Sequence, residues 1–230
     1  MSKVLTAVIV SMLLSTGCQS QKAWVYAPNQ FQDKQALSSK KAIVQQFEDL
    51  RENDNSNYIG FYVVPLFPFG WQDFKVPEGS SGHVFSHLWI NYKPTEDFPK
   101  ALASELQNAR VFKEAHFDFG RGDAEVIVSG KILNTDYSGK LITYGLSVYG
   151  PVLWLIGLPA GTVSNDPSVE IHCIDANSNR QLFAKTYTVP TYSRWGWIYS
   201  MPNDFNYPDM LKYIYMQFVS DLSASSALSP

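Results

Sequence analysis

The spacing of apolar residues predicts helices in three parts of the chain. Residues three or four positions apart share one face of a helix, so an apolar stripe at this spacing marks a face that packs on a core. Such stripes begin after Thr95, which we expect to cap its helix, and after Pro208. Their members are Phe98, Leu102, Leu106 and Ala109 in the first and Leu211, Ile214, Tyr215, Phe218 and Leu222 in the second. Between 33 and 50 a third helix is predicted by Leu37, Ile43, Val44, Phe47 and Leu50.

Other stretches have the alternation or the residue types of strands. Residues 83–92 and 124–133 alternate between two faces, and 58–64 is rich in aromatic and β-branched residues. Residues 169–174 and 181–189 flank a polar turn, which is typical of a hairpin. Helices mixed with strands in this order predict an α+β fold. We expect a single domain with a mixed or antiparallel sheet and with helices packed on one face.

The segment from Leu141 to Val163 contains no charged residue and interrupts this order as an apolar insert. It could be a membrane-spanning helix, a surface loop that dips into a membrane or meets a partner, or an apolar hairpin and turn packed over the domain. Pro151 and Pro159 break helical continuity, and one crossing would place the flanking strands on opposite sides of a membrane. We therefore favour the packed hairpin.

Aromatic loops accompany the insert. Residues 67–71 and 192–199 are rich in rings with an apolar body and a polar tip, which suit a wet interface or a bilayer boundary. The simpler interpretation is that these loops cap the sheet. Our candidate contact residues for a partner or a membrane are Leu153, Trp154, Leu155 and Ile156 in the insert, with Trp71, Trp195 and Trp197 in the loops.

The amino terminus has the layout of a cleaved export signal. Lys3 precedes the uncharged run from Val4 to Leu14, and small residues lead to Cys18. The run is too short for a bilayer-spanning helix, which needs about 20 apolar residues. A buried helix of the domain is the alternative, but the run lacks the polar face of such a helix. We predict that residues 1–17 are removed.

The sequence Leu14-Ser-Thr-Gly-Cys18 resembles the lipobox of bacterial lipoproteins, although Ser15 stands where leucine is usual. The resemblance implies that Cys18 carries acyl chains, palmitate among them, and that these chains make a bacterial membrane the first partner. Because Gln19 is not aspartate, it also implies the periplasmic face of the outer membrane, with the inner membrane as the lesser possibility. Several acyl chains hold a protein to a bilayer without a transmembrane helix.

The cysteine count agrees with this interpretation. The chain has two cysteines, and an acylated Cys18 leaves Cys173 without a disulfide partner. A bridge between them would suit an oxidising periplasm but would require a different cleavage of the signal. Cys173 follows Val169 and Ile171 in an alternating run, so we expect a small buried hydrophobic side chain there.

Charge and composition set the remaining limits. The chain has 18 basic and 21 acidic residues without a basic cluster, which argues against a nucleic-acid partner. After loss of the signal, 17 basic and 21 acidic groups remain, because only Lys3 is removed. We divide the mature chain into a lipidated tether at 18–29, the α+β domain at 30–222 with its insert at 141–163, and a flexible tail at 223–230.

The residues that often perform chemistry do not form a recognisable site in the sequence. His83 and His87 are four apart in a strand pattern without a third ligand, and 79–83 lacks the spacing of a nucleophile elbow. The carboxylates are scattered along the chain. We therefore predict no catalytic residue, no metal site and no cofactor.

Three segments together resemble the periplasmic α/β domain of envelope assembly lipoproteins, a group that includes the curli-secretion lipoprotein and the lipoprotein activator of penicillin-binding proteins. These segments are Phe98–Phe112, Ala124–Ile132 and Val169–Asn179. The resemblance implies a non-enzymatic scaffold or assembly factor that binds an envelope protein or its own copies. The alternatives are an envelope enzyme acting on cell-wall or lipid substrates, and an oligomeric secretion component that inserts residues 141–163 into the membrane.

Overall fold

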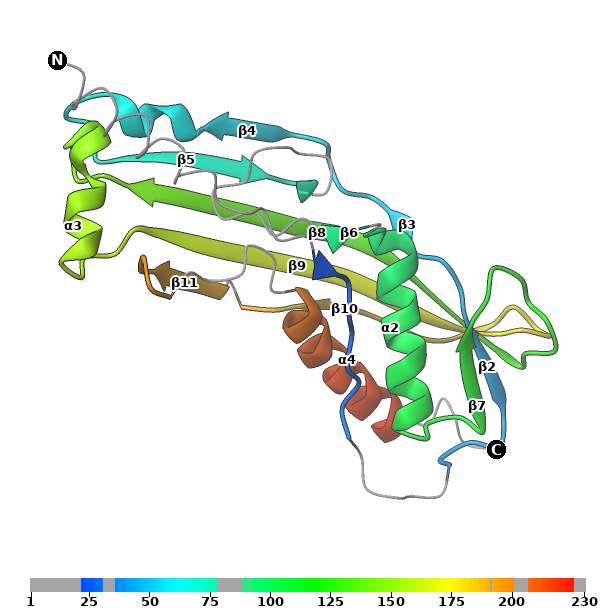
Figure 1. Cartoon of the computed structure of the whole chain (residues 1–230). Helices are drawn as coiled ribbons and strands as arrows, with labels where there is room; N and C mark the ends of the chain where they lie inside the picture. The colour runs from blue at the N-terminus through cyan, green and yellow to red at the C-terminus, as the bar shows by residue number, and fades with distance from the viewer. Residues whose placement is uncertain are drawn as a thin grey trace, which may run out of the picture.

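The computed structural model describes residues 22–30, 36–77, 89–90, 92–190, 192–200 and 207–225, and it has the predicted α+β architecture in a single domain (Figure 1). Two long strands, β8 (Val126–Ile142) and β9 (Gly161–Asp175), form an antiparallel hairpin that runs along most of the molecule. The other described strands of the main sheet are attached to this hairpin, directly or through one neighbour.

The main sheet is mixed. Its longest path follows the order β10-β9-β8-β2-β7, in which β2 (Lys41–Val44) is parallel to β8 and to β7 (Glu114–Phe117). β10 (Gln181–Thr188) is antiparallel to β9. The shorter strands are β3 (Glu48–Asp49) and β5 (Phe69–Phe74), both beside β8, β4 (Asn55–Tyr58) beside β5, and β11 (Tyr192–Gly196) beside β9. A separate parallel pair joins β1 (Lys22–Ala23) to β6 (Trp89–Ile90).

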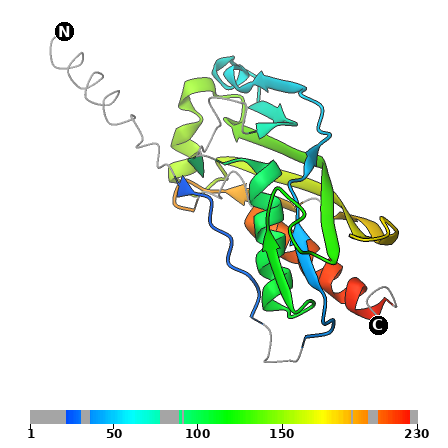
Figure 2. The same ribbon diagram turned by 90° about the vertical axis from the view of Figure 1, so that its right-hand side faces the viewer.

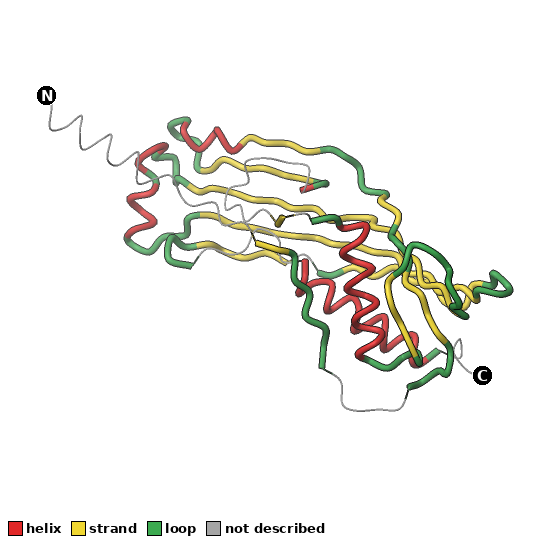
Figure 3. The backbone as a smooth tube through the Cα atoms, turned by 45° about the vertical axis from the view of Figure 1, so that its right-hand side comes forward, coloured by secondary structure: helices red, strands yellow, loops and turns green. Residues whose placement is uncertain are grey.

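Two helices, α2 (Pro94–Asn108) and α4 (Tyr207–Ala224), cover one face of the sheet (Figure 1 and Figure 3). They pack against each other and against β2, β8, β9 and β10. Fully buried members of the core between these layers include Leu102, Leu106, Val128, Ile171 and Phe218. Burying an aliphatic or aromatic side chain of this size contributes about 1.5–3 kcal/mol, so apolar packing is the main attraction between helices and sheet.

The start of α2 differs from the sequence prediction. The N-cap is Lys93 and not Thr95, and the Lys93 N–H donates to Asp97 Oδ2 at 2.7 Å. Pro99 lies inside the helix and has no N–H, so it leaves the Thr95 carbonyl without its helical donor. The Phe47 N–H donates to that carbonyl at 3.0 Å. This hydrogen bond ties the chain after β2 to the helix.

The β8–β9 hairpin divides into two halves. A β-bulge shifts the register between Ile132 and Asn134. Near this level β9 also changes its outer neighbour, because β10 ends opposite Ser168 and β11 begins opposite Asn165. Pro167 lies between these two positions and has no N–H for a neighbouring strand. We call the part before the bulge, which α2 and α4 cover, the helical half. The part beyond the bulge, with β4, β5 and β11, is the open half, and of the two helices only the first turn of α4 packs on it, through Tyr207 and Met210.

Two predicted elements are wrong. The helix predicted for 33–50 is not formed over 36–50, the part that the structure describes, where the chain makes β2 and β3. Ile43 and Val44 are buried in a strand with a neighbour on each side, and a short apolar run fits such a strand as well as a helix. The strand predicted for 58–64 is instead a 3-10 helix, η1 (Ile59–Val63), which follows β4.

The longer predicted elements are confirmed. Helices α2 and α4 and the β9–β10 hairpin occur where their patterns place them, and the strand predicted for 124–133 forms the first part of β8. Of the strand predicted for 83–92, residues 83–88 and 91 lie outside the described residues, and 89–90 form β6.

The described part of the expected tether, residues 22–29, is docked on the domain and is not a free spacer. Lys22 and Ala23 form β1, and the Trp24 ring packs against the core. The buried carboxylate of Glu105 on α2 accepts hydrogen bonds from Tyr26 Oη at 2.9 Å and from Asn29 N and Nδ2 at 3.1 and 2.6 Å. Residues 22–29 therefore belong to the folded body.

The apolar insert is not one continuous element. It contains the ends of β8 and β9 and, between them, a 3-10 turn, η3 (Ser147–Tyr149), and a five-residue helix, α3 (Pro151–Leu155). Within the described ranges, no helix has the length and apolar character needed to cross a membrane.

Candidate functional site

Three uncharged runs that are distant in the sequence meet at one end of the open half. They are residues 58–72, 141–165 and 195–200. Strand pairing aligns them, because Gly70 lies opposite Leu141, Leu141 opposite Gly161, and Gly161 opposite Gly196. We call the segments at this end of the sheet, residues 59–68, 143–160 and 195–199, the apolar end. Figure 2 shows α3 beside η1 there, away from α4.

Backbone hydrogen bonds hold the segments of the apolar end together. The Leu66 N–H donates to the Gly145 carbonyl at 3.0 Å, and the Ala160 N–H donates to the Gly196 carbonyl at 2.7 Å. Leu66, Tyr144 and Ser147 have positive φ angles of 71°, 59° and 54°. Non-glycine residues in this region cost of order 1–3 kcal/mol and often mark functional segments. The apolar end therefore has a defined backbone and is held in a costly conformation.

The apolar end presents many large hydrophobic side chains to solvent. Leu66 is 89% exposed and Ile156 is 74% exposed. The other exposed members are Val63, Val64, Phe67, Tyr144, Leu146, Val148, Tyr149, Val152, Leu155, Leu158, Trp195, Trp197 and Tyr199. Soluble monomers rarely leave contiguous apolar patches larger than a few hundred Å² in contact with water. This exposed apolar surface is therefore the candidate binding site.

The candidate contact residues divide into an exposed group and a supporting group. Leu155, Ile156, Trp195 and Trp197 are exposed. Leu153 and Trp154 are half-buried, and Trp154 Nε1 donates to the Ile142 carbonyl at 2.8 Å. Trp71 is also half-buried.

Trp71 is stacked on Phe61 with ring centroids 5.5 Å apart, and it also contacts Tyr58 at 5.2 Å. Trp71, Leu153 and Trp154 therefore support the apolar end, while the exposed four form part of its surface.

Cross-strand pairing orders the charges behind the apolar end. Lys140 is in the same row as Trp71 and Trp195 across β5, β8, β9 and β11. Arg194 is in the next row back, and Asp73 is in the row after that. Among the described residues of these four strands, counted away from the apolar end, Lys140 and Arg194 therefore come before the first acidic residue, Asp73. Lys140 Nζ also lies 5.3 Å from the centre of the Phe69 ring.

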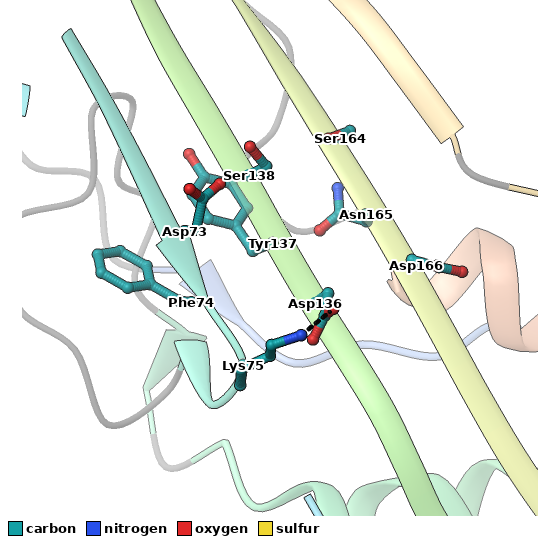
Figure 4. Close-up of a pocket in the computed structure, with 9 residues that line it drawn as sticks. All are labelled: Asp73, Phe74, Lys75, Asp136, Tyr137, Ser138, Ser164, Asn165 and Asp166. Atoms are coloured by element: carbon teal, nitrogen blue, oxygen red, sulfur yellow. Dashed lines mark hydrogen bonds and ion pairs between the residues drawn. The ribbon is translucent and has the colours of Figure 1, made fainter. Parts of the chain in front are cut away.

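A polar hollow of about 290 Å³ lies farther back on the open half (Figure 4). Lys75 Nζ and Asp136 Oδ2 form an ion pair of 2.8 Å at its edge, and Asp136 raises the pKa of Lys75. The pKa of Asp166 is raised by burial and by the Asp136 charge. The remaining lining residues include Asp73, Ser138 and Ser164. These groups are carboxylates, hydroxyls and one ammonium, without an activated nucleophile beside a base.

Comparison with known proteins places the chain in no family. No family model matches it, and no curated protein matches it. Among solved structures, a Xanthomonas campestris protein of the DUF330 family is similar at 12% identity, with 90% of this chain and 95% of that chain covered and a TM-score of 0.45. The PelC dodecamer from Paraburkholderia phytofirmans is similar at 11% identity, with 87% and 98% covered and a TM-score of 0.39.

A putative neuraminyllactose-binding hemagglutinin homolog from Helicobacter pylori is similar at 8% identity, with 84% of this chain and 90% of that chain covered and a TM-score of 0.35. At these identities and scores the three likenesses concern the general course of the backbone, and they carry no argument about function.

Several other candidate positions play no part in the apolar end. Cys173 is fully buried in the helical half, as expected, and burial raises the pKa of its thiol to about 12. Cys18, His83 and His87 lie outside the described residues. Within the described ranges, no group of three His, Cys, Asp or Glu side chains is placed to hold a metal ion.

Sequence reasoning selected the insert and the loop at 67–71 as candidate contact segments, but it missed residues 59–66 and named no contact residue in η3. Leu66, Val148, Tyr149, Val152 and Tyr199 are as exposed as the selected residues. The signal for the first segment was present, because 58–72 is an uncharged run like the insert. What the sequence did not show is the strand pairing that brings the two runs together.

Proposed function

We propose that this protein is a non-enzymatic, lipid-anchored protein of the bacterial envelope that acts by binding, with the apolar end as its contact surface. The observation that carries the proposal is the convergence of three uncharged segments into one exposed surface. An apolar surface of this kind stabilises a contact when it is removed from water, and it supplies no acid, base or nucleophile.

The start of the folded body supports an anchored arrangement. β1 begins at Lys22, so three residues separate it from Cys18. A fully extended chain covers at most about 3.3–3.6 Å per residue, so a lipid on Cys18 lies within about 14 Å of β1. Acylation at this position would hold the domain at the membrane surface rather than on a long tether.

The anchoring part of the proposal is tested by metabolic labelling with radioactive palmitate in bacteria that express the protein. We expect label on the wild type and none on the Cys18→Ser variant. Equal labelling of both, or of neither, would remove the lipid anchor and with it the envelope location.

The binding part is tested by crosslinking in intact envelopes. We expect a variant with Leu155→Ser and Ile156→Ser to lose contacts that the wild type makes, to lipid or to protein. Leu37→Ser is the matched control, because Leu37 is 57% exposed and Leu155 is 58% exposed, and Leu37 lies outside the apolar end. Identical crosslinks in the wild type and both variants would contradict a contact role for the apolar end.

A further inference from the structure

We propose that the apolar end enters the interfacial layer of a phospholipid bilayer that contains anionic headgroups, and that it forms a second membrane contact of the domain. This inference rests on the proposed function and names the partner of its contact surface. Three features of the described residues favour a bilayer over a protein: the lack of charge, the hydrogen bonding of several polar groups within the surface, and the order of the flanking charges. The short link between the predicted anchor at Cys18 and β1 adds to them.

The lack of charge extends over all three segments of the apolar end. Its most exposed side chains are aliphatic or aromatic, with Leu66 and Tyr199 at 89% and 80% exposure. Protein interfaces are surrounded by polar rims and carry about one hydrogen bond per 100–200 Å². A bilayer interface instead takes aliphatic side chains at the acyl boundary, with tyrosine and tryptophan at the level of the headgroups. The composition of the apolar end matches the second description.

Three polar side chains of the apolar end form hydrogen bonds to backbone carbonyls within it or directly beside it. Trp154 Nε1 donates to the Ile142 carbonyl at 2.8 Å, and Tyr144 Oη donates to the Pro159 carbonyl at 2.7 Å. Ser147 Oγ donates to the Val63 carbonyl. A polar group that enters an apolar medium without a partner costs several kcal/mol, and these three groups avoid that cost. The surface can leave water without leaving these groups unpaired.

Two basic residues on the flanking strands lie closer to the apolar end than the acidic residues of those strands do, and an anionic surface attracts such an arrangement. Among the described residues of β5, β8, β9 and β11, Lys140 lies in the last row of the apolar end, beside Trp195, Arg194 lies one row farther back, and Asp73 lies one row behind Arg194. When the apolar side chains reach the acyl boundary, these two basic side chains come closer to the headgroups than the acidic side chains of the same four strands do. Basic residues at this level are attracted to anionic lipids, and the attraction weakens with salt.

The depth of the contact is limited by its secondary structure. The only helices of the apolar end among the described residues are short: α3 has five residues, η1 has five and η3 has three. Turn backbone can stay at the boundary between headgroups and acyl chains, where water satisfies free carbonyl groups, but it does not enter the hydrocarbon core exposed to lipid. We therefore infer shallow insertion.

The predicted anchor would make a shallow contact effective. A lipid on Cys18 keeps the domain within about 14 Å of its attachment point. Once one site is attached, a second, weaker contact forms at a high effective concentration. The apolar end therefore does not need high affinity by itself to remain on the membrane and to orient the domain.

The test uses a chain that begins at Gln19, which lacks Cys18 and retains every described residue. The probes are vesicles of phosphatidylethanolamine with phosphatidylglycerol and vesicles of phosphatidylcholine alone. Binding is measured by sedimentation and by a blue shift of tryptophan emission, since Trp195 and Trp197 are exposed in the free protein. We expect binding to both vesicles, stronger when phosphatidylglycerol is present, and a loss of that difference at high salt.

Matched variants separate insertion of the apolar end from adsorption of the protein through some other surface. Leu155→Ser with Ile156→Ser is expected to weaken binding about tenfold or more, from the apolar area lost, while Leu37→Ser leaves binding unchanged. Lys140→Gln with Arg194→Gln is expected to remove the preference for phosphatidylglycerol. Circular dichroism of each variant checks that the fold is retained.

Three results would overturn the inference. The first is absence of binding to either vesicle. The second is equal weakening by Leu37→Ser. The third is that the protein binds neither kind of vesicle but forms a concentration-dependent dimer, which the Leu155→Ser substitution dissociates. A second copy of the chain would then be the occupant of the apolar end. Because this chain lacks Cys18, such a failure leaves the labelling test of the lipid anchor unaffected.

Discussion

The helical half and the open half use the same two strands for different purposes. In the helical half, inward residues of β8 and β9 such as Val128 and Ile171 are fully buried beneath α2 and α4. In the open half, the same strands carry Asp136, Ser138 and Lys140 on one face and lead to the apolar end. One continuous hairpin thus provides a packed core at one end and presents a surface at the other.

The difference shows how stability and contact are separated in this molecule. Side chains in the helical half are buried within the protein, so their removal should change the free energy of unfolding. Exposed side chains of the apolar end gain little from folding, so their removal should change binding and leave the free energy of unfolding nearly unaltered. The following experiments test this separation.

The largest expected effect is in the helical core. Phe218 on α4 is fully buried and contacts Phe183 and Tyr187 edge to face. Phe218→Ala should lower the free energy of unfolding by about 3–5 kcal/mol, since it removes a large buried side chain and leaves a cavity. Ile156→Ala at the apolar end should change it by less than about 0.5 kcal/mol. Urea denaturation measures both, and similar losses in the two variants would contradict the separation.

A smaller effect is expected where the amino-terminal segment docks on α2. Glu105→Ala removes a buried carboxylate that accepts hydrogen bonds from Tyr26 and Asn29. Loss of such bonds should cost about 1.5–3 kcal/mol and expose residues 22–30 to limited proteolysis. Glu96→Ala is the control, because Glu96 pairs with Lys100 at the surface and its removal should leave both stability and the docking of residues 22–30 nearly unchanged. Proteolysis at the same rate as in the wild type would show that Glu105 does not hold this segment.

The backbone of the apolar end should respond to one added methyl group. A Cβ at Gly150 would lie 2.6 Å from Thr143 Cα, so Gly150→Ala forces the turn to shift and should cost about 1–3 kcal/mol. At Gly60 no heavy atom lies within 4 Å of the added Cβ, so Gly60→Ala is the matched control. Thermal unfolding and vesicle binding are the measurements. Equal behaviour of the two variants would mean that the apolar end has no defined backbone.

The smallest effect concerns a surface contact between α4 and β10. The Lys185 hydrogen bond lowers the pKa of Asp221 in the folded protein, so this carboxylate adds stability above its unfolded pKa and loses it as pH falls through the folded pKa. Asp221→Asn should cost about 0.5 kcal/mol at neutral pH and nothing below the folded pKa. Urea denaturation at several pH values tests this, and a cost that stays constant with pH would contradict it.

Long periodic segments made much of the helical half predictable. The stripes of α2 and α4 and the alternation of β9 and β10 each extend over enough residues to distinguish a helix from a strand. β2 was mistaken for a helix because Ile43 and Val44 form a short run that is buried between β7 and β8, where both faces are apolar.

The open half was less predictable because its structure depends on pairing between distant segments. β5 lies in a stretch with Pro68 and Gly70, which interrupt a strand pattern, yet it pairs with β8 along its whole length. The insert was recognised by its lack of charge, but the association of η1 with η3 required knowledge of that pairing. In the structure Trp195 is exposed and Trp154 is half-buried. The sequence does not predict this difference between the two tryptophans.

The bulge in β8 has a consequence for the dimensions of the molecule. Nine residues of β8, from Asn134 to Ile142, lie between the bulge and the end of the strand, which corresponds to about 30 Å at 3.3–3.4 Å per residue. This length sets the standoff of the helical half from any surface that the tip touches. Lengthening both strands by two residues would increase that standoff by about 7 Å and keep every side chain on its face, whereas a change of one residue would reverse the faces.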